Sequence, residues 1–93
     1  MEIRHFVTFK KVVESGSFTQ AAELLGYTQS TVTSHIQALE EHIGAPLFDR
    51  MGRKVKLTDV GKRLIGYTEE ILNTYGKIES IASDAEDVRG ELK

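Results

Sequence analysis

The sequence predicts a mainly α-helical fold, in which three short helices and a short β-hairpin precede one long helix. Apolar residues recur at helical spacing in four segments, and glycines end the first three of them. Only the stretch around residues 54–57 alternates with the period of a strand. A hydrophobic content of 40% with a single proline is typical of one folded, helix-rich domain rather than of a disordered chain.

The first two predicted helices are short, and each stops at a glycine. The first covers residues 2–15, before Gly16, and its broad apolar face consists of Ile3, Phe6, Val7, Phe9, Val12 and Val13. The second lies in "SFTQAAELLG", where Ser17 or Thr19 can cap the start and Gly26 ends the helix.

A third helix is predicted over residues 28–43, with Thr28 as its N-terminal cap. Val32, Ile36 and Leu39 are spaced as the apolar stripe of a helix. Two short helices followed by a longer one, joined by glycine-containing turns, are typical of a helix-turn-helix unit.

The next segment predicts a short hairpin, because Val55 and Leu57 alternate with lysines. We expect residues 48–50 to pair with residues 54–57 around a turn at Met51-Gly52. A hairpin directly after a helix-turn-helix is a wing. The predicted fold class is therefore a winged helix-turn-helix, followed by a long helix.

The long helix is predicted from Asp59 to about Val88, with Thr58 as its cap. Its apolar stripe alternates steps of three and four residues and consists of Val60, Leu64, Tyr67, Ile71, Tyr75, Ile78 and Ala82. A helix of this length cannot bury its whole stripe against three short helices. We therefore expect the stripe to form the interface of a two-fold homodimer. The alternative is a stripe that folds back on its own domain.

The first two turns of the third helix are crowded with hydroxyl and amide side chains and contain no lysine or arginine. In a helix-turn-helix, the N-terminal residues of the second helix of the motif enter the major groove of DNA. Short polar side chains there permit close approach to phosphates and base edges. We therefore expect a DNA contact surface made of Thr28, Gln29, Ser30, Thr31, Thr33, Ser34, His35 and Gln37. The alternatives are a merely solvated helix start and, for His35, a solvated side chain without a contact.

The distribution of charge also favours nucleic acid, although the net charge of −2 does not. Residues 50–63 are strongly basic, whereas residues 66–93 carry an excess of carboxylates. No lysine or arginine lies between residues 12 and 49, so electrostatic affinity must come from the basic segment. Arg50, Arg53 and Lys54 lie on the predicted wing, where they can reach the DNA backbone or a narrow minor groove.

Other classes of function are poorly supported. The absence of cysteine excludes disulfides, thiolate metal sites and cysteine nucleophiles. The apolar runs are too short to span a membrane and no signal-peptide core is present, so we expect a cytoplasmic protein. The three histidines lack metal-ligand spacing and no catalytic motif occurs, so we expect neither an enzyme nor a cofactor.

Three motifs follow one another along the chain: "GSFTQAAELL", then Gln29 with "IQALEEHIGAPLFDR", and then "LTDVG". In order and spacing they resemble the motifs of the N-terminal winged helix-turn-helix of LysR-type transcriptional regulators. The resemblance covers about residues 3–65 without a gap, and the long helix matches the linker helix of that family. It implies a bacterial DNA-binding domain that dimerises through this helix and binds interrupted palindromes in promoter DNA. Full members carry a further domain that binds a small-molecule effector, and they often form tetramers.

The resemblance implies a DNA-binding domain over residues 1–58, a linker or dimerisation helix over residues 59–89, and the start of a connection to an absent effector domain over residues 90–93. The family commonly has proline at the position of Ser30 and arginine at that of Ser34, so base preference cannot be transferred from relatives. The missing arginine and the net charge of −2 leave a second hypothesis open. It is a protein-interaction module that pairs through the long helix without binding DNA.

Overall fold

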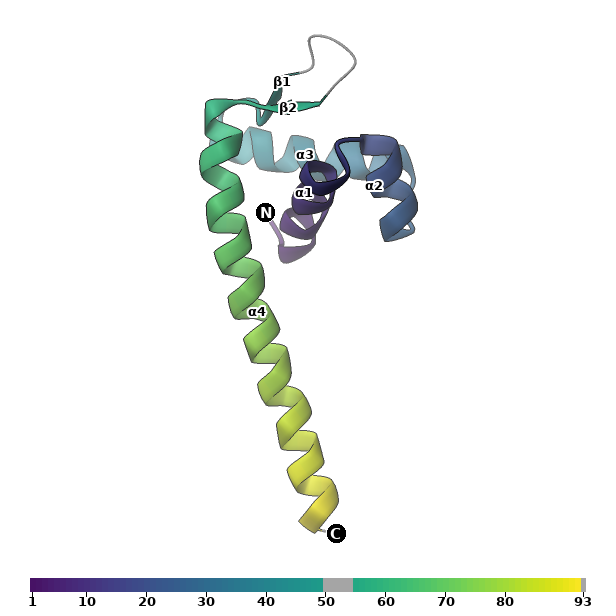
Figure 1. Cartoon of the computed structure of the whole chain (residues 1–93), viewed down its shortest axis with the longest axis vertical. Helices are drawn as coiled ribbons and strands as arrows, with labels where there is room; N and C mark the ends of the chain where they lie inside the picture. The colour runs from purple at the N-terminus through teal and green to yellow at the C-terminus, as the bar shows by residue number, and fades with distance from the viewer. Residues whose placement is uncertain (50–54, 93) are drawn as a thin grey trace.

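The computed structural model describes residues 1–49 and 55–92, with side chains described for 1–49 and 55–84. Its elements are, in order, α1 (Ile3–Ser15), α2 (Phe18–Leu25), α3 (Gln29–Ile43), β1 (Phe48–Asp49), β2 (Lys56–Leu57) and α4 (Asp59–Leu92). Helices α1 to α3 and the hairpin gather around one end of α4, and the rest of α4 extends away from them (Figure 1). The 34 residues of α4 make it about 51 Å long, which explains the 58 Å long axis of the molecule.

The ends of the first three helices lie where the sequence predicts them. Ser17, rather than Thr19, caps α2, since its side chain accepts a hydrogen bond from the Gln20 N–H at 3.2 Å. The Thr28 hydroxyl caps α3 in the same way, accepting from the Thr31 N–H at 3.2 Å. Each of the three helices ends at a glycine in the left-handed conformation, which side chains with a Cβ rarely adopt.

The core lies between α1, α2 and α3 and is closed by the residues that follow α3. It consists of Phe6, Phe9, Val12, Ala21, Ala22, Val32, Ile36, Leu39, Leu47 and Phe48. The ring of Phe48 joins the hairpin to the helices, with ring centroids 5.5 Å from Phe9 and 5.6 Å from Phe18. The predicted stripe of α3 is confirmed, because Val32, Ile36 and Leu39 are all fully buried.

The predicted hairpin is confirmed in the part of the chain that the structure describes. Phe48 pairs with Leu57 and Asp49 with Lys56, in antiparallel register. The remaining residues of the predicted wing, 50–54, lie outside the described residues, and the predicted turn and Arg50, Arg53 and Lys54 lie with them. The base of the hairpin is fixed from α3, since the Leu47 N–H donates to Glu40 Oε2 at 2.8 Å.

The start of α4 is anchored against the same backbone. The Thr58 hydroxyl accepts from the Gly61 N–H at 3.1 Å, as expected of a cap, and donates to the Pro46 carbonyl at 2.7 Å. The Thr58 N–H donates to the Leu47 carbonyl at 3.0 Å. Gly61 is buried so closely beneath this segment that a Cβ on it would overlap the Leu47 carbonyl oxygen.

Two features of α4 differ from the sequence-based expectation. The helix runs on to Leu92, so Gly90–Leu92 belong to it, although we expected it to end before them. Val60 and Leu64 pack against the hydrophobic core of their own domain, together with Ile65 and Leu72. For its first turns, the apolar stripe therefore folds back on the domain, because the α3–β1 connection and α1 lie directly beside it.

Candidate nucleic-acid interface

The start of α3 presents a continuous neutral polar surface. Five of its predicted contact residues are exposed and two, Thr31 and Thr33, are half-buried; the exposed ones are Thr28, Gln29, Ser30, Ser34 and Gln37. The helix is fixed from behind by its fully buried apolar stripe. A rigid helix end with free N–H groups and short polar side chains can approach a phosphate backbone or a base edge closely.

Hydrogen bonds already order several of these side chains. The Thr28 hydroxyl lies 3.1 Å from the Ser30 hydroxyl and 2.9 Å from that of Thr31. The Thr19 hydroxyl, from α2, donates to Gln29 Oε1 at 3.3 Å. Thr19 is not among the predicted contact residues, because it is ten residues from Gln29 and only the turn between the helices brings the two together. The surface is thus preorganised from two helices.

The prediction that His35 faces the groove is wrong. Its side chain is buried at 8% exposure, and its Nδ1 lies 2.8 Å from the Thr8 hydroxyl of α1. The spacing of the sequence did contain the signal, since His35 is three residues after Val32 and four before Leu39, on the edge of the buried stripe. His35 therefore does not belong to the polar surface of α3.

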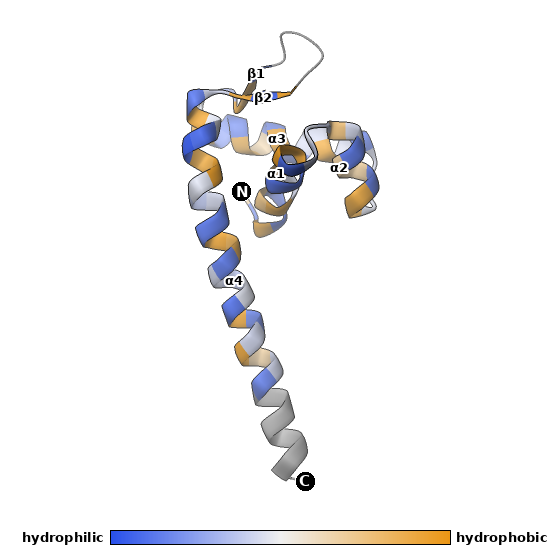
Figure 2. Cartoon of the chain, viewed as in Figure 1, coloured by the Kyte–Doolittle hydropathy of each residue, from blue (hydrophilic) through white to orange (hydrophobic). Residues whose placement is uncertain are grey.

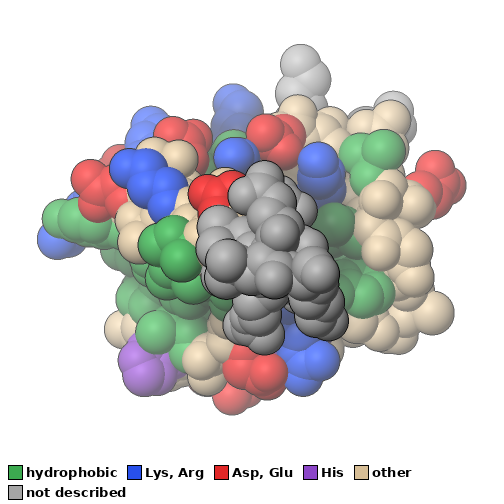
Figure 3. All heavy atoms as spheres, turned by 90° about the horizontal axis from the view of Figure 1, so that it is seen from below, with side chains coloured by type: hydrophobic (Ala, Val, Ile, Leu, Met, Phe, Trp, Pro, Cys, Tyr) green, Lys and Arg blue, Asp and Glu red, His purple; other side chains and the backbone are tan. Residues whose placement is uncertain are grey.

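Beyond its first turns, the predicted stripe of α4 is exposed. Tyr67 is 60% exposed, Ile71 38%, Tyr75 42% and Ile78 57%, and Ala82 is exposed as well. Ile81, 66% exposed, extends this face, although it is not part of the predicted stripe. Figure 2 shows the hydrophobic positions that recur along α4, and Figure 3 shows hydrophobic patches around its base, seen along the helix from its far end. We call Tyr67, Ile71, Tyr75, Ile78 and Ile81 the exposed face of α4.

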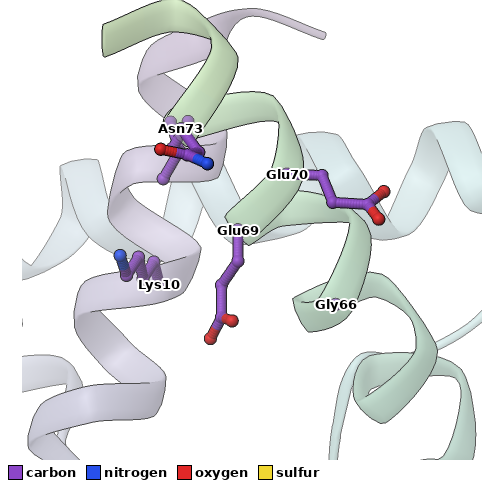
Figure 4. A pocket seen from close by; sticks show the side chains of 6 residues that line it. Lys10, Gly66, Glu69, Glu70 and Asn73 are labelled. Atoms are coloured by element: carbon purple, nitrogen blue, oxygen red, sulfur yellow. The ribbon is translucent and has the colours of Figure 1, made fainter. Parts of the chain in front are cut away.

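Two grooves lie between α4 and α1, which pack side by side. One is apolar and is lined by Ile3 of α1 and by Ile71, Tyr75 and Ile78 of α4. The other is polar: Lys10 of α1 and Glu69 and Asn73 of α4 lie along it (Figure 4). Within the exposed face, the Tyr75 hydroxyl donates to the Glu79 carboxylate, and this hydrogen bond raises the pKa of Tyr75. The apolar groove is continuous with the exposed face of α4, because they share three residues.

Within residues 1–49 and 55–84, no group of histidine, aspartate and glutamate side chains could hold a metal ion. None of the described helices is both long enough and apolar enough to cross a lipid bilayer.

Three helices, a two-stranded hairpin after the third, and an uncovered polar start of α3 together define a winged helix-turn-helix domain. The chain belongs to the LysR family of bacterial regulatory helix-turn-helix proteins, whose family model matches residues 3–62.

Curated relatives and solved structures agree with this assignment. Over all 93 residues, the chain is 42% identical to the uncharacterized HTH-type transcriptional regulator YfiE of Escherichia coli K12 and 38% identical to YwqM of Bacillus subtilis 168. It spans about a third of their length, 32% in each case.

Two solved structures of DNA complexes are similar to this chain. The crystal structure of BenM_DBD with catB site 1 DNA is 37% identical, covers 89% of this chain and 93% of its own, and superposes with a TM-score of 0.84. The CbnR_DBD–DNA complex is 32% identical, with coverages of 91% and 98% and a TM-score of 0.83.

Proposed function

We propose that this chain is the DNA-binding domain of a bacterial transcription regulator. It inserts the start of α3 into the major groove, places the wing of residues 48–57 on the backbone or the minor groove, and binds promoter DNA as a homodimer through α4. The observation that carries this proposal is the exposed, neutral polar surface at the N-terminus of α3, held on a fully buried apolar stripe. Such a surface suits close contact with base edges.

Two further observations support DNA as the partner. BenM_DBD and CbnR_DBD, which share the fold of this chain, were each solved with DNA. Around the hairpin, Lys56, Lys62 and Arg63 are exposed, on the same segment as the three cations of the predicted wing. The cations and the neutral helix would have different roles. The cations would supply affinity through contacts with phosphates, and α3 would supply the contacts with bases. A promoter-binding regulator acts in the bacterial cytoplasm and has no catalytic role.

The exposed face of α4 supports the homodimer. Five large apolar side chains lie exposed on one face of this single helix, each at least 38% exposed, and such a face favours association. A two-fold axis through this face would repeat the DNA contacts on a second half-site. The first turns of α4, which include Val60 and Leu64, would serve instead to fix the helix to its own domain.

Selection from a random duplex-DNA library with the purified chain, at moderate salt, tests the proposal. We expect enrichment of an interrupted palindrome, since a dimer presents two copies of α3. If the chain is a protein-interaction module instead, no sequence will be enriched and no duplex will be bound even at low salt, while the chain still associates through α4.

Wing cations and α3 side chains should differ in their effects on binding. We expect Arg53→Ala to weaken binding to all sequences alike and to lower the slope of log K against log salt by about one for each subunit bound. Thr33→Val, which replaces the hydroxyl with a methyl group of similar size, should change base preference at one position of each half-site. Binding titrations at several salt concentrations on matched and mismatched duplexes measure both. An unchanged salt slope in Arg53→Ala would show that the wing is not part of the DNA interface.

The hydrogen bond from Thr19 predicts how Gln29 contacts DNA. With Oε1 held by the Thr19 hydroxyl, Gln29 presents its NH2 group, which favours base-edge acceptors such as guanine N7 and O6. Thr19→Val should free Oε1 for the bidentate contact with adenine and shift preference at that position toward adenine, by roughly tenfold or less. Thr19→Ser keeps the hydroxyl and serves as the control. Equal preferences for the two variants would exclude this role of Thr19.

A further inference from the structure

Two histidines lie against each other between α1 and α3. The ring centroids of His5 and His35 are 4.8 Å apart, with an interplanar angle of 42°, and each residue is only 8% exposed. Tyr27, in the turn before α3, makes a T-shaped contact with His35, with ring centroids 5.3 Å apart. The pair therefore links the start of α1 to the helix that carries the proposed DNA contacts.

The hydrogen bonds of this pair depend on neutral imidazoles. The Glu2 N–H donates to His5 Nδ1 at 3.2 Å. A backbone N–H can only donate, so His5 Nδ1 must be the unprotonated nitrogen of its ring. A second proton on His5 would occupy Nδ1 and break this bond, which helps to start α1. His35 Nδ1 lies 2.8 Å from the fully buried Thr8 hydroxyl, which can donate or accept.

Burial and neighbouring cations outweigh the compensation that the surroundings give to positive charge on the pair. Burial lowers the pKa of both histidines below the usual 6.5, and Arg4 lowers both further. The N-terminal amine adds to the effect on His5, and His5 itself to that on His35. Glu2 is the one described carboxylate that opposes these effects, and its Oε2 is 4.0 Å from His5 Nε2 on the solvent side.

We propose that His5, Thr8 and His35 form an acid-sensitive latch: while both rings are neutral they hold α3 against α1, and their protonation loosens α3 and weakens DNA binding. The DNA part of this inference rests on the proposed function, whereas the stability part does not. His35 is a positioning residue here, because it acts on DNA through α3 and not by contact.

The sign of the pH dependence follows from proton linkage. Since the pKa of each histidine is lower in the folded than in the unfolded state, the unfolded chain binds more protons below pH 6.5. The stabilising effect is complete above that pH and is lost as the pH falls. Between pH 7.5 and 5.5 the folding equilibrium constant should fall by up to about tenfold for each histidine.

Urea unfolding at constant ionic strength from pH 5.5 to 7.5 tests the latch without DNA. We expect His5→Gln and His35→Gln to flatten the loss of stability seen in the unsubstituted chain. His42→Gln, at an exposed position on α3, is the matched control and should keep the full pH dependence. If either variant fails to fold, NMR titration of the unsubstituted chain decides instead. A pKa for His5 and His35 that is not lowered from the usual 6.5 would overturn the proposal.

Binding of duplex DNA over the same pH range, measured without urea so that the chain stays folded, tests whether protonation of the latch weakens DNA binding through α3. We expect affinity to fall several-fold from pH 7.5 to 5.5, and less in His35→Gln than in His42→Gln. Stability that varies with pH while affinity does not would overturn the link between latch and recognition. Absence of any duplex binding at pH 7.5 would instead contradict the proposed function, and the unfolding experiment would still decide on the latch.

Discussion

Replacement of Gly61 by alanine is expected to destabilise the domain by about 2–3 kcal/mol, one of the two largest effects we predict. The added Cβ would overlap the carbonyl oxygen of Leu47, which is backbone and cannot rotate aside. The same Leu47 carbonyl accepts a hydrogen bond from the Thr58 N–H, and the Leu47 N–H donates one to Glu40. Any shift of this backbone would therefore disturb the anchoring of both the hairpin and α4. Urea unfolding at fixed protein concentration measures the change.

Gly66 and Gly76 provide matched controls on the same helix. A Cβ on either would meet no atom within 4 Å. Gly66→Ala and Gly76→Ala should therefore stabilise the chain by about 0.5–1 kcal/mol each, because alanine loses less backbone entropy than glycine on entering a helix. A Gly61→Ala variant as stable as these two would show that the start of α4 has room to move away from Leu47.

The substitution Ile71→Glu is expected to abolish dimerisation at micromolar concentrations. In a two-fold interface, the new carboxylates of both subunits would be buried. We expect this to reduce the free energy of dimerisation by about 3 kcal/mol or more, which weakens the dimer at least about 100-fold. Sedimentation equilibrium gives the dimer dissociation constant. Binding to the selected palindrome should weaken as well, whereas binding to a single half-site should not, since Ile71 lies 12 residues after the start of α4, about 18 Å along the helix, and is not among the proposed DNA contacts.

Ser80→Glu is the matched control, because Ser80 is exposed on the side of α4 opposite Ile71. It should leave both the dimer and the affinity for DNA unchanged. Leu64→Ala gives a second comparison: Leu64 packs on its own core, so its truncation should lower the stability of the domain rather than the strength of the dimer. Equal dimerisation of Ile71→Glu and Ser80→Glu would mean that the exposed face of α4 is not the interface.

The contrast between Leu64 and Ile71 also shows where the sequence was insufficient. Both belong to one apolar stripe with helical spacing, and the pattern is the same along its length. Only the position of the three-helix domain beside the first turns of α4 decides that Leu64 packs against the core of its own chain, whereas Ile71 lies outside that core and stays 38% exposed. His35 is a similar case, because its partner Thr8 is 27 residues away and lies on another helix.

The sequence by itself determined the helices, the ends of the first three of them, and the family. Caps such as Ser17 and Thr28, the terminal glycines and the stripe of α3 act over a few neighbouring residues, so their effects can be predicted from short patterns. Tertiary structure alone decided the contacts of His35 with His5 and Thr8, the hydrogen bond of Thr19 to Gln29, and the division of the α4 stripe. These features depend on which surfaces meet after the chain has folded, and contacts between residues distant in sequence leave no local periodicity.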